Sequence, residues 1–117
     1  MFLVGKAVFA GLPDHEKAYL LERFTFAPKT PASITSREVF LAQIHEVLEK
    51  GYAVDVEENV IGILCVGAAV FDYSGMPVGA VSISWPAERG GRERLETLQE
   101  PLRKTCTVIS RAMGYRK

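Results

Sequence analysis

The sequence has little of what several classes of protein depend on. Among its 117 residues are two cysteines, two histidines and one tryptophan, and fourteen Lys plus Arg balance fourteen Asp plus Glu. Two cysteines are too few for a disulfide scaffold or a four-thiolate zinc site, so we expect reduced thiols. A net charge of zero lacks the basic footprint of a stand-alone nucleic-acid binder, so the chain by itself is not expected to contact DNA.

Long hydrophobic runs are also missing. The longest apolar stretch extends from Val60 to Phe71, well short of the ~20 residues that cross a bilayer, and it contains glycines. The apolar opening segment 1–10 is interrupted by Lys6 and has no basic leader, which is a poor match to a signal peptide. We therefore expect a cytoplasmic chain with no membrane partner.

Two helices are expected in the first half of what reads as a single domain. Asp14 is the predicted N-cap of the first helix, whose apolar residues include Phe24. Thr35 and Glu38 have the spacing of a capping box at the start of the second helix. Gly51 follows that helix where a left-handed stop belongs.

Three strands are expected in the middle of the chain. Apolar Tyr52, Val54 and Val56 alternate with Ala53, Asp55 and Glu57, which predicts a half-buried strand. The nearly apolar segment 61–71 is typical of a central strand, and turn residues at 72–75 join it to a third strand at 78–85. The last two strands are therefore predicted to form a hairpin.

An amphipathic helix is expected to end the chain. Its apolar residues recur at spacings of three and four, namely Leu95, Leu98, Leu102, Cys106, Ile109 and Met113. Pro101 should bend or divide this helix, and Gly114 should stop it. The predicted fold is therefore α+β, with an antiparallel sheet covered by helices; three strands make it thin, so a further segment or another copy of the chain could complete it.

Two serines on the third strand are the first candidates for chemistry. Ser82 and Ser84 are two residues apart, so both hydroxyls point to one face, which either meets water or lines a small polar pocket. Whether Cys65 joins them depends on the hairpin register. A three-residue loop at 73–75 sets Cys65 opposite Ile83, whereas a four-residue loop sets it opposite Ser84, unless a bulge intervenes.

The remaining polar candidates have simpler explanations. Asp55 lies on a strand with apolar neighbours, and by itself it is expected to face solvent. His15 and His45 share no ligand spacing with each other or with Cys65, so we expect both on helix surfaces, with no metal site and no cofactor. No motif marks a histidine or oxyanion donors for Cys65, which favours an inert thiol over a nucleophile.

Several short motifs, taken in order, resemble a known family. They are Gly5-Lys6-Ala7, Gly51-Tyr52 with Asp55-Val56-Glu57-Glu58, Gly62-Ile63-Leu64-Cys65, Val81-Ser82-Ile83-Ser84, and a closing Ser110 to Tyr115. At these separations the chain resembles, over nearly all its length, the C-terminal effector-binding domain of IclR-type bacterial transcription regulators. The resemblance implies an α+β, GAF-like antiparallel sheet flanked by helices, with the family's N-terminal strands absent from this chain.

The resemblance also implies a ligand site and a role. Carried over by motif, the effector-binding positions are Val4 and Gly5 through their backbone, Asp55, Ile63, Cys65, Ser82 and Ser84. Residues 1–117 would form one partial effector-binding domain, not an enzyme, that senses a small carboxylate or an aromatic acid. It would assemble with itself as a dimer or tetramer and control DNA only through a domain absent from this chain.

Two other functions remain open at this point. The chain could be an oligomerisation module with no functional ligand pocket, or, less favoured, a small enzyme that uses Cys65.

Overall fold

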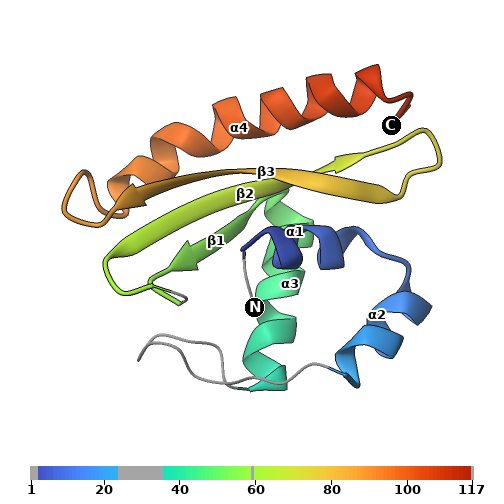
Figure 1. The fold of residues 1–117 in the computed structure, drawn as a ribbon, viewed down its shortest axis with the longest axis horizontal. Helices are drawn as coiled ribbons and strands as arrows, with labels where there is room; N and C mark the ends of the chain where they lie inside the picture. The colour runs from blue at the N-terminus through green and yellow to red at the C-terminus, as the bar shows by residue number, and fades with distance from the viewer. Residues whose placement is uncertain (1–2, 24–35, 59, 117) are drawn as a thin grey trace.

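Helices cover both faces of a three-stranded antiparallel sheet in the computed structural model, which describes residues 3–23, 36–58 and 60–116 (Figure 1). The elements in chain order are α1 (Leu3–Gly11), α2 (Asp14–Leu21), α3 (Arg37–Lys50), β1 (Ala53–Val56), β2 (Ile63–Phe71), β3 (Pro77–Pro86) and α4 (Glu93–Ala112). Helix α4 lies along one face of the sheet, and α1 and α3 lie on the other (Figure 1). The predicted α+β class is confirmed.

Helix α1 was not predicted, because its segment is apolar almost throughout and shows no clear period. Leu3, Ala7 and Ala10 are buried on it, as are Lys6 and Phe9. The helix lies between the sheet and α3, so side chains around most of its circumference are covered. A helix covered on several sides carries no polar stripe, which is the signal that sequence patterns rely on.

The helix caps differ from the predicted ones by one residue. Pro13, rather than Asp14, is the N-cap of α2, and it makes no side-chain cap hydrogen bond. Helix α3 is capped by Ser36 rather than Thr35, which lies outside the described residues; the Ser36 Oγ accepts from the Val39 N–H at 3.1 Å. Gly51 ends α3 with φ +84°, a backbone conformation that favours glycine, as predicted.

The β2–β3 hairpin combines a three-residue loop with a bulge. The Asp72 N–H donates to the Met76 carbonyl at 3.0 Å, which is the short-loop pairing. Phe71 then pairs with Pro77 but Val70 pairs with Gly79, so Val78 is left without a partner. This one extra residue shifts the register, as a β-bulge does, and returns Cys65 to a position opposite Ser84. The predicted three-residue loop is therefore present at the turn, and the pairing of Cys65 with Ser84 that was predicted for a four-residue loop is present along the strands.

Alternate residues of β2 pack in two different hydrophobic clusters, one on each face of the sheet. Leu64, Val66, Ala68 and Val70 are buried with Trp85 against Leu102 and Cys106 of α4. Cys65 and Ala69, on the opposite side, pack against Leu3, Ala7 and Ala53. A Cβ at Gly67 would lie 3.0 Å from Leu3 Cδ2, so glycine allows α1 to approach the sheet closely.

The burial of β1 is the reverse of the predicted one. Ala53 and Asp55 are buried, while Val54 and Val56 are only half-buried. The sequence pattern assumed that one face of this strand meets water, but α1 and α3 cover the Ala53 side. An aspartate can be buried there because its carboxylate is hydrogen-bonded.

Helix α4 runs through Pro101 as one element, so Pro101 does not divide it, and the bend that was the other predicted effect stays a prediction. Pro101 is exposed, and water can reach the carbonyl that its ring leaves without an intrahelical donor. The helix ends as predicted: Gly114 has φ +91°, and the Tyr115 N–H donates to the Ser110 carbonyl. Ile109 and Met113, which the pattern placed on the buried face, are exposed.

Candidate functional site

A row of polar side chains crosses all three strands on the face covered by α1. Asp55 of β1 is directly opposite Cys65 of β2, and Cys65 is directly opposite Ser84 of β3. Opposite residues of antiparallel strands project on the same side of the sheet. Cys65 Sγ and Ser84 Oγ are 3.1 Å apart and share a hydrogen bond in which either can donate. We call these three residues the polar row.

Two further candidates flank the polar row. Ser82 is opposite Gly67 in the next row, and Ile63 is opposite Pro86 in the row on the other side. Ser82 and Ser84 are exposed, and Cys65 and Ile63 are half-buried. The row is therefore open to solvent at its β3 end and covered at its β1 end.

The two backbone candidates, Val4 and Gly5, lie in the first turn of α1. The first N–H groups of a helix have no acceptor within it, so this turn carries hydrogen-bond donors. Leu3, in the same turn, packs in the cluster that Cys65 contacts. The start of α1 therefore lies beside the polar row, as the motif order implied.

Asp55 does not face solvent, so that expectation is corrected. Its side chain is 4% exposed, and its Oδ1 accepts from the Glu58 N–H at 2.8 Å. This hydrogen bond closes the turn that follows β1, the local role that short acidic side chains often fill. Any ligand contact by Asp55 would therefore add to a structural one.

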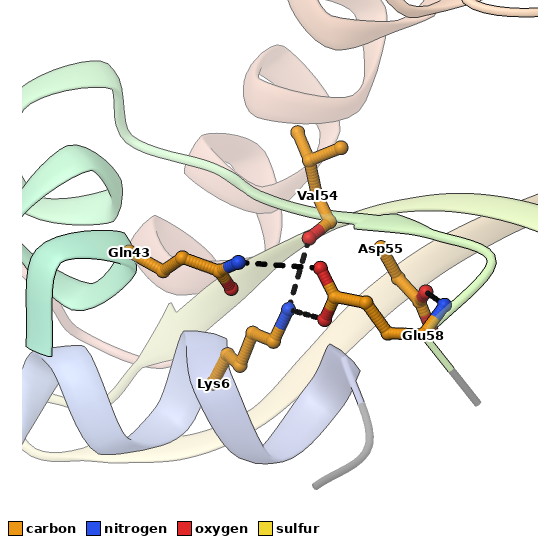
Figure 2. A network of polar contacts seen from close by, with 5 residues as sticks. All are labelled: Lys6, Gln43, Val54, Asp55 and Glu58. Atoms are coloured by element: carbon orange, nitrogen blue, oxygen red, sulfur yellow. Dashed lines mark hydrogen bonds and ion pairs between the residues drawn. The ribbon is translucent and has the colours of Figure 1, made fainter. Parts of the chain in front are cut away.

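A buried ion pair ties α1 to the same turn (Figure 2). Lys6, 1% exposed, pairs through Nζ with the Glu58 carboxylate and donates to the Val54 carbonyl oxygen at 3.1 Å. The other carboxylate oxygen of Glu58 accepts from Gln43 Nε2 of α3 at 3.3 Å. Three elements thus meet at one buried ammonium, directly beside Asp55.

Sequence reasoning missed this network. The available signal was the single cation, Lys6, in an otherwise apolar segment, together with the acidic pair Glu57-Glu58 after a strand. A lysine among apolar residues is buried only when it is paired, so a carboxylate partner could have been sought. The network was missed because charged residues were assumed to face water.

Two cavities that border the sheet lie away from the polar row. The larger of these two, of about 520 Å³, is lined by α3, β1 and the turn after β1, and Lys6, Gln43 and Glu58 contribute to its wall. The smaller, of about 240 Å³, lies between α4 and the end of β2, where Phe71 and Tyr115 stack with ring centroids 5.2 Å apart. Neither cavity is lined by Cys65, Ser82 or Ser84.

The cysteines and histidines show no catalytic arrangement. Burial raises the pKa of the Cys106 thiol, which opposes thiolate formation. His15 and His45 are exposed on helices, as predicted. Within the described ranges, no three His, Cys, Asp or Glu side chains gather as a metal site would require. None of the helices there has both the length and the apolar character needed to span a membrane.

Comparison with known proteins decides the family. Residues 3–111 match the family of the bacterial transcriptional regulator IclR C-terminal domain. The chain belongs to this family. The predicted resemblance is therefore confirmed.

Relatives of the chain agree with this assignment. The HTH-type transcriptional regulator XynR of Escherichia coli is 34% identical over 112 residues, which cover 96% of this chain and 44% of XynR. The Thermotoga maritima IclR crystal structure has a TM-score of 0.89 at 40% identity and covers 95% of this chain and 45% of that one. The chain thus spans less than half the length of these relatives. They are named as regulators, which agrees with the expected absence of enzymatic activity.

A more distant structure shares the fold alone. It is a double mutant of the PobR inducer-binding domain from Acinetobacter, in complex with 3-hydroxybenzoic acid. Its TM-score is 0.83 at 22% identity, and the match covers 93% of this chain and 65% of that one.

Proposed function

We propose that the chain is a small-molecule sensor and oligomerisation domain of an IclR-type transcription regulator, and that residues 1–117 form one partial effector-binding domain. Its effector is a small carboxylate or an aromatic acid bound at the polar row. Binding biases the arrangement of subunits and so controls DNA-binding domains in the rest of the regulator. A ligand can do this only to the extent that it binds one arrangement more tightly than another.

The observation that carries the proposal is the alignment of Asp55, Cys65 and Ser84 across three strands. Polar side chains in register on an otherwise apolar sheet face are typical of small-molecule sites, where few polar groups fix a ligand's orientation. Ser82, one row away, and the start of α1 extend the polar surface to the same region.

The chemistry of this surface suits an acid. The Ser82 and Ser84 hydroxyls and the N–H groups at Val4 and Gly5 can donate to a carboxylate without burying an opposing charge. Ile63 supplies an apolar wall. Asp55, whose Oδ1 already accepts from Glu58, would accept from a hydroxyl of the effector, because a second carboxylate beside it would be repelled.

Two findings from relatives support the proposal. The XynR and IclR relatives are regulators more than twice as long as this chain, which leaves room in them for other domains. The PobR domain, which has this fold, was crystallised with an aromatic acid. Self-association and a cytoplasmic location are carried over to this chain as parts of the same proposal.

An oligomerisation module without a ligand pocket is the second candidate. It is favoured by the packing of Leu3 at Gly67, which occupies part of the same sheet face, and by cavities that lie elsewhere. On this alternative the hydroxyls of Ser82 and Ser84 are a solvated strand surface.

A thermal-shift screen of the chain against small carboxylates and aromatic acids separates the two candidates. An effector at 100 times its Kd adds about 2.7 kcal/mol to the stability of the folded state. The double variant Ser82→Ala/Ser84→Ala should remove this stabilisation while leaving the ligand-free melting temperature nearly unchanged, because both serines are exposed.

The matched control removes two exposed hydroxyls elsewhere. Thr105 and Thr107 of α4 each donate to the carbonyl four residues earlier, far from the polar row, and Thr105→Ala/Thr107→Ala should keep the ligand response. An acid that stabilises both double variants equally well contradicts the proposed site. A folded chain that no acid stabilises favours the oligomerisation module.

A further inference from the structure

We propose that the cavity of about 240 Å³ between α4 and the end of β2 binds a phosphate group, either as the free ion or as the ester of a small molecule. The charge of its wall has one sign. Arg103 and Arg111 line it, and no carboxylate of a described residue does. The polar row contributes nothing to this wall, so the site stands independently of the proposed effector site.

Both guanidinium groups are accessible and lack a carboxylate partner. Arg103 and Arg111 are exposed, and neither forms an ion pair with a described residue. Arg103 Nη1 donates to the neutral Gln99 Oε1 at 3.2 Å. Its Nε and Nη2 lie 3.3 and 3.9 Å from the position that a Cβ of Gly51, another lining residue, would occupy. These two N–H-bearing atoms, which together bind an oxyanion in a bidentate manner, have no acceptor in the described chain.

The backbone adds a donor at the end of β2. The Ile63 carbonyl oxygen accepts from the Glu57 N–H, so every second residue of β2 from Ile63 onward directs its backbone groups to the β1 side. Gly67 is the last of these residues that pairs with β1. Ala69 is the next, and its N–H points past the end of β1 at the cavity that Ala69 lines. This N–H makes no hydrogen bond to the described residues.

These donors favour a phosphate group over a carboxylate. A carboxylate has one negative charge and two oxygens, and a single guanidinium satisfies both oxygens. A phosphate ester carries a charge of about −1.5 to −2 at pH 7 and has three acceptor oxygens. It can therefore balance both arginines and still accept from the Ala69 N–H. No Asp or Glu occurs between Pro101 and Ala112, so the second half of α4 carries no carboxylate that would repel it.

The size and the apolar side of the cavity limit what the phosphate is attached to. A volume of about 240 Å³ is below the ~300 Å³ at which pockets for drug-sized ligands begin, so a few carbon atoms fit and a nucleotide does not. The rings of Phe71 and Tyr115, stacked with centroids 5.2 Å apart, offer these carbons an apolar surface. The Ala69 carbonyl oxygen, which faces the same side as its N–H, can accept from a hydroxyl. Glycerol 3-phosphate has this combination of groups.

Titration of the 117-residue chain with inorganic phosphate and with glycerol 3-phosphate tests the site. Millimolar concentrations at constant ionic strength avoid both the stabilisation that phosphate causes by exclusion from the surface and changes in charge screening. A ligand at 100 times its Kd should raise the melting temperature by about 10 °C. The rise should saturate and should be lost in Arg103→Gln/Arg111→Gln, a variant expected to fold because both side chains are exposed.

The matched control is Arg89→Gln/Arg94→Gln. It removes the same charge from two exposed arginines, one before α4 and one in its first turn. It should keep the response, as should Ser82→Ala/Ser84→Ala. A second measurement covers the case in which the test variant folds poorly: in the unmodified chain, the Ala69 backbone amide signal in an ¹⁵N correlation spectrum should move saturably with the ligand.

The two ligands distinguish the sources of the phosphate group. Tighter binding of glycerol 3-phosphate identifies an ester as the ligand, whereas equal affinities identify the free ion; either result supports the site.

Four outcomes overturn the proposal. One is a well-folded chain that neither ligand stabilises. Another is a stabilisation that Arg103→Gln/Arg111→Gln retains, or that the Arg89→Gln/Arg94→Gln control loses equally, which would indicate a general attraction by charge. The third is a response lost in Ser82→Ala/Ser84→Ala, which places the anion at the polar row. The fourth is acetate that stabilises the chain as strongly as phosphate through the same two arginines, which assigns the cavity to carboxylates.

Discussion

Replacing Lys6 by methionine should destabilise the domain far more than removing a surface ion pair. The Lys6 and Glu58 side chains are 1% and 11% exposed, so both charges of the pair are largely desolvated. Methionine keeps much of the apolar stem of lysine, so the loss is mainly that of the charge and its hydrogen bonds. Removing one partner of a buried pair costs about 3–5 kcal/mol, because the other charge stays buried. Since Glu58 retains some contact with solvent, we expect about 3 kcal/mol for Lys6→Met.

Urea unfolding followed by far-ultraviolet circular dichroism measures this loss. The control is Lys104→Met, because the Lys104–Glu100 pair on α4 is 3.4 Å apart with side chains 75% and 65% exposed. Exposed pairs of this kind contribute about 0.5 kcal/mol or less, so this variant should unfold almost like the original chain.

A double variant separates charge from packing. Lys6→Met/Glu58→Leu buries no uncompensated carboxylate, so it should be more stable than Lys6→Met alone by about 2 kcal/mol. A loss under about 1 kcal/mol in Lys6→Met, or a double variant that is less stable than the single one, would refute the reasoning that a desolvated ion pair joins α1 to β1.

Four further predictions concern other parts of the molecule. Gly67→Ala should cost about 1–3 kcal/mol in urea unfolding, because its Cβ would lie 3.0 Å from Leu3 Cδ2 and 3.3 Å from the Val81 carbonyl oxygen; an unchanged midpoint would contradict the close approach of α1. Ser110→Ala should cost about 1–3 kcal/mol, since the Ser110 hydroxyl accepts from the Phe71 N–H at 3.0 Å, and Ser110→Thr should recover part of that loss. Cys65 should react with a thiol-specific disulfide reagent well before Cys106, whose pKa burial raises; equal rates would argue against the α4 core as described. The hydrogen bond from the Ser74 side chain lowers the pKa of Asp72 below its ordinary value of 3.8. The ionised Asp72 carboxylate therefore stabilises the hairpin above pH 3.8, and this stabilisation is lost as the pH falls through the lowered pKa. Asp72→Asn should remove this loss of stability at acid pH.

The sequence was informative wherever one face of an element meets water. Helix α3, strand β3 and helix α4 each have a polar side, so their periods and stops could be read, down to Gly51 and Gly114 as the glycines that end helices. Strand β2 was recognised instead from its continuous apolar run and the turn residues that follow it. Helix α1 and the burial of β1 could not be predicted, because both are covered on more than one side by elements distant in sequence. Hydrophobic periodicity shows which face of an element meets solvent, and these two elements have little surface exposed to solvent.

The candidate site was likewise predictable only in part. The shared face of Ser82 and Ser84 follows from the strand period alone, whereas the position of Cys65 opposite Ser84 required a bulge that no residue pattern fixed in advance. Asp55 was misplaced toward solvent because its hydrogen bond to Glu58 and the cover of α1 are tertiary facts. Lys6 was overlooked because its partners lie some fifty positions away in the chain.

The bulge at Val78 has a consequence for how this domain can change over evolutionary time. Loss of one residue between Gly79 and Ser82, with the bulge kept, would exchange the two faces of the strand beyond it and turn Ser82 and Ser84 toward α4. Loss of Val78 would only straighten the hairpin, because Gly79 already pairs with Val70 and every later pair stays in place. A one-residue gap in an alignment of related sequences should therefore be tolerated at this position and selected against along the rest of the strand. The exposed Val78 is also the position at which the hairpin can change length without moving the polar row.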